Sequence, residues 1–222
     1  SPLAGLEKEI LVAEILDEVF EIVFTMVANE TRFNEIETQF PEFAVKINKT
    51  NNLKSVLTEI KVFKNSSNFS YKHAVIDLKD LKENKFCTLL LMMFKSSYKE
   101  LSTNKLTVEH VLPQKPKQKD WAGYFPKLFD ENEKVVEKET ESTIYSIGNM
   151  LLIEDKQNKS LSNFSFDVKK EKLEKLKFID LFEQIPELKI SNTDVWDHNT
   201  IKVRAEKIKS VLKSRFKGLS VK

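Results

Sequence analysis

Hydrophobic residues in the first hundred positions recur at intervals of three and four, a spacing that places them on one face of an α-helix. The longest such run covers residues 6–28. A second run follows the Asn pair at 51–52, which is expected to cap its first turn. Segments 71–81 and 85–101 are further helical candidates. The pattern predicts a helical scaffold over residues 1–104.

The pattern changes in the second half of the chain. Two short apolar runs with β-branched residues, 106–112 and 150–153, are typical of strands, and we expect them to pair antiparallel. Helical patterns follow at 166–182 and 200–216. The chain has only four Gly and six Pro, which favours a mostly helical protein. We therefore predict a mainly α fold with a small β component, with a second domain over residues 105–222.

Polar residues interrupt the two apolar runs where a core strand would not place them. Glu109 and His110 lie in the first run, Asn149 precedes the second, and Asn158 follows nine residues later. A carboxylate and an amide oxygen suit a hard divalent cation, so Glu109 and Asn158 are candidate ligands for one Mg²⁺ or Mn²⁺. The imidazole of His110 is a candidate general base. Asn149 is expected to accept a hydrogen bond from Nδ1 of that imidazole. Together these residues indicate a phosphodiesterase.

Each of these residues also has an ordinary structural explanation. His110 suits the end of a strand, and Glu109 suits the protein surface. Asn149 follows a Gly and suits a turn, because Asn tolerates left-handed backbone conformations. Asn158 precedes Lys159-Ser160-Leu161 and suits a helix N-cap. The sequence alone leaves these alternatives open.

Composition argues against a membrane-spanning protein and against a structural zinc site. Hydrophobic residues make up 41% and charged residues 32% of the chain, and no apolar run approaches the ~20 residues of a membrane span. The single cysteine, Cys87, suits a reducing cytoplasm, and with only three His a structural zinc site is not expected. The chain opens with Ser1 and has no signal segment, so we expect a fragment of a longer cytoplasmic protein.

Positive charge is concentrated at the end of the chain. Residues 200–222 hold eight Lys and Arg against one Glu, whereas the whole chain has a net charge of +2. A helix with that excess suits contact with phosphates, although a solvated surface explains it equally well. The candidate substrate-binding lysines are Lys159, Lys169, Lys202, Lys209 and Lys213.

Four short motifs occur in a fixed order along the second half of the chain. They are Glu109-His110-Val111-Leu112-Pro113-Gln114, then Gly148-Asn149, then Asn158 with Ser162, then Phe166 with Lys169, followed by Trp196 and Arg204. This order resembles the HNH (ββα-metal) nucleases, and most closely the C-terminal domain of GmrSD-type, modification-dependent restriction systems. The resemblance covers roughly residues 105–217.

The resemblance implies a ββα-metal core followed by C-terminal helices. It also implies a metal-dependent DNA endonuclease or nickase of bacterial anti-phage restriction, acting on modified phage DNA. An NTP-hydrolysing, modification-sensing domain would precede this fragment. Trp196 and Arg204 are expected to pack the last helix against the core. Two other functions stay open: an inactive HNH-like module that binds nucleic acid or docks a partner, and a helical interaction scaffold.

Overall fold

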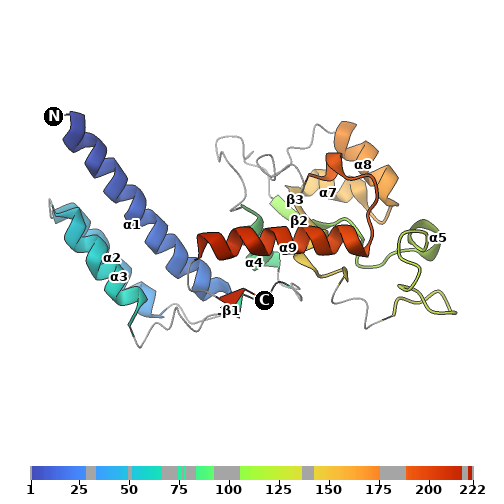
Figure 1. Cartoon of the computed structure of the whole chain (residues 1–222), viewed down its shortest axis with the longest axis horizontal. Helices are drawn as coiled ribbons and strands as arrows, with labels where there is room; N and C mark the ends of the chain where they lie inside the picture. Colours follow the sequence, from blue (N-terminus) through green and yellow to red (C-terminus); the bar gives the residue numbers. More distant parts are fainter. Residues whose placement is uncertain are drawn as a thin grey trace. The chain divides into compact units, whose positions relative to one another are not determined.

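The computed structural model describes residues 2–28, 34–49, 52–66, 75–76, 78, 84–92, 106–136, 143–175, 189–216 and 220–221 (Figure 1). The chain divides into two compact units. The terminal unit comprises residues 1–76 and 213–222, and the central unit comprises residues 77–212.

The described residues of the terminal unit form three helices and a short parallel strand pair. Its elements are α1 (Pro2–Ala28), α2 (Asn34–Lys49), α3 (Leu53–Lys64), β1 (Val75–Ile76) and β4 (Ser220–Val221). Helix α3 contacts both α1 and α2 (Figure 1). The ring of Phe24 stacks on that of Phe216 at a centroid distance of 4.6 Å. Apolar residues at helical spacing therefore form this core, as the sequence predicts.

Two expectations for this region are tested by the described residues. The side chain of Asn52 accepts a hydrogen bond of 3.1 Å from the Ser55 amide, which confirms the predicted cap of α3. The helix predicted over 71–81 is wrong at Val75–Ile76, which pair with Ser220–Val221 as strands. That pairing joins residues far apart in sequence, so no local pattern announces it. Most of the predicted segment lies outside the described residues.

The central unit contains an antiparallel strand pair among short helices. Its elements are α4 (Asn84–Met92), β2 (Leu106–His110), α5 (Gln118–Trp121), the 3₁₀-helix η3 (Ile147–Asn149), β3 (Met150–Glu154), α7 (Asp155–Leu161), α8 (Phe166–Lys175), the 3₁₀-helix η5 (Ile190–Asn192) and most of α9 (His198–Arg215). The pairing runs from Leu106 opposite Glu154 to His110 opposite Met150. The mainly helical fold with a small antiparallel sheet is thus confirmed, and α7 follows β3 without a linker.

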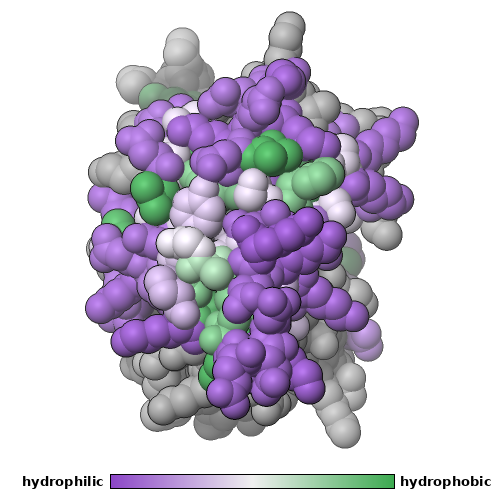
Figure 2. Space-filling model, turned by 90° about the vertical axis from the view of Figure 1, so that its right-hand side faces the viewer, coloured by the Kyte–Doolittle hydropathy of each residue, from purple (hydrophilic) through white to green (hydrophobic). Residues whose placement is uncertain are grey.

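A hydrophobic core lies around this sheet. Trp121, Phe125, Phe166 and Trp196 are fully buried, and the rings of Phe166 and Trp196 stack at 5.5 Å. The insertion between the two strands therefore contributes to the core through α5. The face in Figure 2 is mainly hydrophilic, with small separate hydrophobic areas. Among the helices that the structure describes, none is both long and apolar enough to cross a membrane.

Candidate active site

A pocket of about 320 Å³ lies where β2 ends beside α7. It is lined by Val108, Glu109, His110, Pro113, Gln114, Asn158, Lys159, Ser162 and Asn163. The fold thus gathers Glu109, His110, Asn158 and Lys159, four of the candidate residues, around one cavity. Gln114 and Ser162 also line the pocket, and both belong to the sequence motifs, although the sequence predicts no role for either of them.

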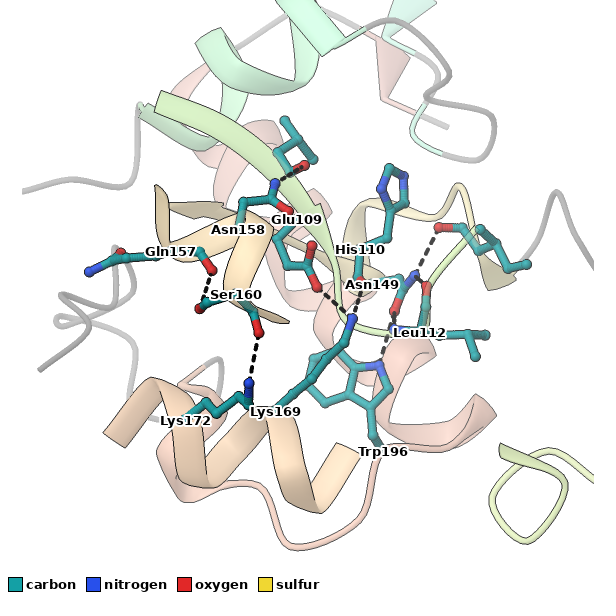
Figure 3. A network of polar contacts seen from close by, with 12 residues as sticks. Glu109, His110, Leu112, Asn149, Gln157, Asn158, Ser160, Lys169, Lys172 and Trp196 are labelled. Atoms are coloured by element: carbon teal, nitrogen blue, oxygen red, sulfur yellow. Dashed lines mark hydrogen bonds and ion pairs between the residues drawn. The ribbon is translucent and has the colours of Figure 1, made fainter. Parts of the chain in front are cut away.

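Local structure places the pocket residues. His110 is the last residue of β2, and the next residue, Val111, donates a 2.9 Å hydrogen bond from its amide to the carbonyl of Asn149 in η3. Successive side chains of a strand point to opposite sides. Accordingly, the imidazole of His110 points away from the carboxylate of Glu109 (Figure 3).

Asn158 ties helix α7 to strand β2. Its Nδ2 donates hydrogen bonds to Thr107 Oγ1 at 2.9 Å and to the Val108 carbonyl at 3.1 Å. A carbonyl only accepts, which fixes the orientation of the amide and leaves Oδ1 as its available oxygen. The helix-cap alternative is wrong, because α7 begins at Asp155 and its N-cap is Glu154. Asn158 thus offers an oxygen ligand from inside the helix.

The carboxylate of Glu109 is paired with a buried ammonium. Lys169 Nζ lies 2.5 Å from Glu109 Oε1 and 3.0 Å from the His110 carbonyl (Figure 3). The side chains of Lys169 and Glu109 are 1% and 8% exposed. Burial raises the pKa of Glu109, and Lys169 opposes that rise. Burial lowers the pKa of Lys169, against the pull of Glu109.

The position of Lys169 does not suit the substrate-binding role that the sequence predicts for it. The ammonium is buried against Glu109, and Lys169 does not line the pocket. The sequence did carry a signal, since Phe166, Lys169 and Leu173 share one face of α8 and all three are buried. A lysine on the apolar face of a helix indicates a buried partner.

His110 is buried and neutral near pH 7. Burial and the charge of Lys169 lower its pKa from 6.5 to about 4. Its Nε2 has no hydrogen-bond partner among the described residues, and its ring meets Tyr145 edge-on at 5.8 Å. Buried polar atoms are almost always hydrogen-bonded, so an unpartnered ring nitrogen is a feature of chemical interest. A neutral imidazole has a lone pair that can accept a proton.

Asn149 is a buried structural residue. Its Oδ1 accepts from the Leu112 amide at 2.8 Å and from Trp196 Nε1 at 3.0 Å, while its Nδ2 donates to the carbonyls of Leu112 and Ile144 at 2.9 Å. These four bonds replace the expected contact with Nδ1 of His110 (Figure 3). The left-handed turn alternative is also wrong, because Asn149 lies in η3 with an ordinary φ. Asn149 therefore fixes the segment that follows His110.

Arg204 of α9 and Trp196 of the preceding loop fix the position of Asn149 and of its neighbour Gly148. Arg204 Nε donates 2.8 Å to the Gly148 carbonyl, and its guanidinium lies 5.0 Å from the Trp196 ring. A Cβ on Gly148 would lie 2.0 Å from the Ile201 carbonyl oxygen, so only glycine fits this close approach. The structure confirms that Trp196 and Arg204 pack the last helix against the core.

The other candidate lysines lie outside the pocket, apart from Lys159. Lys159 pairs with Asp155 at 2.6 Å and its side chain is 75% exposed. Lys202 is exposed, and Lys209 lies 3.7 Å from Glu206. Lys213 belongs to the terminal unit. Contact of these four residues with a substrate stays a prediction.

The side-chain oxygen atoms of Glu109 and Asn158 are suitable ligands for a hard cation. Two residues alone do not supply the roughly six oxygen ligands that such a cation usually has. Among the described residues there is no group of three or more His, Cys, Asp or Glu placed to hold a metal ion. A cation at this pocket would take its remaining ligands from water or substrate.

Ser162, at the pocket wall, has φ 45° and ψ −145°, a conformation that non-glycine residues rarely adopt.

Comparison with known protein families identifies the family of this chain. The C-terminal domain of GmrSD restriction endonucleases matches residues 30–211, which include the entire pocket. The chain belongs to this family. No curated protein and no solved structure matches the chain. Membership of this family supports a nuclease role related to restriction endonucleases. Its match begins well before residue 105, and the predicted division at that position stays a prediction.

Proposed function

We propose that this GmrSD C-terminal domain is a metal-dependent endonuclease that hydrolyses DNA phosphodiester bonds, one strand at a time. In this proposal β2, β3 and α7 form the ββα-metal core of an HNH nuclease. The observation that carries it is the single pocket shared by Glu109, His110 and Asn158. Membership of a restriction-endonuclease family supports DNA as the substrate.

Glu109 and Asn158 would hold one Mg²⁺ or Mn²⁺ through their oxygen atoms. An all-oxygen set favours such hard cations over zinc. When bound, the cation would stabilise the negative charge that develops on the phosphate and on the leaving oxygen. Hydrogen bonds from Asn158 Nδ2 to β2 hold this side chain in place, so the ligand needs no reordering.

His110 would act as the general base. The imidazole takes a proton from a water molecule, and the resulting hydroxide attacks the phosphorus in line with the 3′ oxygen. The bond from phosphorus to that oxygen breaks, which leaves a 5′-phosphate and, after protonation by solvent, a 3′-hydroxyl. Because the pKa of His110 is about 4, the ring is unprotonated and its lone pair is available throughout the neutral range.

The cellular setting belongs to the same proposal. The domain would cut modified phage DNA in the bacterial cytoplasm, together with an NTPase and modification-sensing domain on the N-terminal side. Lys159 at the pocket wall, with Lys202, Lys209 and Lys213 on α9, would contact DNA phosphates. Such contacts give affinity without sequence preference.

A second candidate is an inactive HNH-like module that binds nucleic acid or a partner. The pairing of Glu109 with Lys169 favours it, because Lys169 already occupies one oxygen of Glu109, the only carboxylate among the described residues that line the pocket. Incubation of the protein with supercoiled plasmid and Mg²⁺ or Mn²⁺ separates the two functions. The nuclease produces nicked circles with 5′-phosphate ends, and EDTA abolishes them. A folded protein that binds plasmid and leaves it intact supports the inactive module.

A further inference from the structure

Lys169 lies next to the pocket without lining it. It projects from α8, its side chain is 1% exposed, and its ammonium bridges Glu109 Oε1 and the His110 carbonyl (Figure 3). Burying an ammonium is costly unless a carboxylate and further hydrogen bonds compensate it. Both compensating groups belong to the two consecutive residues that carry the proposed chemistry. Lys169 therefore fixes the carboxylate of one and the backbone of the other.

The same contact removes the net charge of the proposed cation site. Glu109 contributes −1 and Lys169 contributes +1, which leaves a net charge of zero for the pair. The affinity of oxygen sites for hard cations depends strongly on the number of ligand charges. No further group of three acidic, His or Cys residues exists among the described residues to supply that charge. The pocket alone is thus a weak cation site.

We infer that Lys169 is a positioning residue that neutralises Glu109, so that the divalent cation binds tightly only together with a DNA phosphate. This inference rests on the proposed function. The phosphate supplies the negative charge that the Glu109–Lys169 pair lacks, and it supplies a further oxygen ligand. By linkage, if DNA strengthens cation binding, the cation strengthens DNA binding by the same factor.

The coupling between cation binding and DNA binding is tested by whether Mn²⁺ raises or lowers the affinity of the protein for DNA. In the His110→Ala protein, which prevents cleavage, affinity for a short duplex is measured by fluorescence anisotropy with and without Mn²⁺ at constant ionic strength. A bridging cation raises DNA affinity by about tenfold or more. Cations that only screen or compete for phosphates lower it. Unchanged or reduced DNA affinity in Mn²⁺ overturns the inference.

Substitution of Lys169 tests the origin of the coupling. Lys169→Gln keeps a hydrogen-bond donor and removes the charge, and at pH 8 it should raise the affinity of the DNA-free protein for Mn²⁺ by about tenfold, measured by calorimetry. Lys170→Gln is the matched control: Lys170 lies on the same helix and donates to the Thr193 carbonyl at 2.9 Å. Lys169→Arg keeps the charge and should keep the weak affinity.

The outcomes separate this inference from the proposed function. A Lys169→Gln protein that melts cooperatively and binds Mn²⁺ no more tightly than wild type overturns the inference. If that variant does not fold, the anisotropy measurement on the His110→Ala protein, which retains Lys169, still tests the inference. Tight Mn²⁺ binding by DNA-free wild type, with plasmid nicking intact, refutes the inference and leaves the nuclease standing. Absence of Mn²⁺ binding and nicking, with and without DNA, refutes both.

Discussion

Substitution of Asn149 by Ala separates a structural role from a chemical one. The change leaves four buried groups without their partner: the amide and carbonyl of Leu112, the Ile144 carbonyl and Trp196 Nε1. At about 1 kcal/mol for each group, the low end of the range for unsatisfied buried groups, the loss is about 4 kcal/mol. For a chain of this size, 1 kcal/mol shifts the melting temperature by roughly 2–4 °C, so we expect a decrease of about 10 °C.

The assay compares thermal melts and plasmid nicking at a temperature where every variant is folded. Asn199→Ala is the control, since Asn199 is an exposed Asn on α9 and its loss should change stability by less than about 0.5 kcal/mol. We expect Asn149→Ala to retain nicking within about tenfold of wild type, because the general base remains. A melting temperature within about 2 °C of wild type would refute the hydrogen-bond argument. A folded Asn149→Ala protein as inactive as His110→Ala would place Asn149 in the chemistry.

Three further predictions concern pH, the cation and DNA. Because burial lowers the pKa of His110 from 6.5 to about 4, the unfolded chain takes up this proton more readily than the folded protein does. The free energy of unfolding should therefore fall by about 3 kcal/mol between pH 6.5 and pH 4. Urea titrations across this range should show that loss for wild type and not for His110→Gln, and parallel curves would contradict the prediction. Asn158→Ala should weaken Mn²⁺ binding in the presence of a duplex, and unaltered calorimetric affinity would move the cation elsewhere. Replacing Lys202, Lys209 and Lys213 with Gln should lower the log–log salt slope of DNA binding by roughly 0.9 per lost contact, whereas an unchanged slope would make them ordinary solvated residues.

The sequence predicts the parts of this fold that depend on local pattern. Amphipathic spacing predicts α1 and α9, and β-branched runs predict β2 and β3 because their side chains suit a pleated, buried surface. The spacing from Asn149 to Asn158 is fixed by β3 and α7 following each other without a linker. Motif order therefore brings Asn158 to the same pocket as Glu109 and His110.

Contacts between distant residues escape the sequence for a physical reason. A lysine on a polar helix is normally exposed, and the apolar neighbours of Lys169 on α8 indicate only that its side chain is buried. Its partner, Glu109, lies sixty residues earlier and is known only from the folded structure. The sequence predicts a contact between Asn149 and His110 because an amide oxygen can accept a hydrogen bond from Nδ1 of an imidazole. The direction of its amide depends on where the backbone of Leu112 returns, which no side-chain pattern records.

Plasmid nicking by wild type and two histidine variants tests the central claim most directly. His198 lies at the start of α9, outside the pocket, so His198→Ala controls for loss of an imidazole. With Mg²⁺ or Mn²⁺, we predict nicked circles from wild type and His198→Ala, and a rate about 10²–10⁴ lower from His110→Ala, with similar melting curves at neutral pH. Equal rates in wild type and His110→Ala, or no nicking by the folded wild-type protein, would contradict the assignment of this pocket as a nuclease active site.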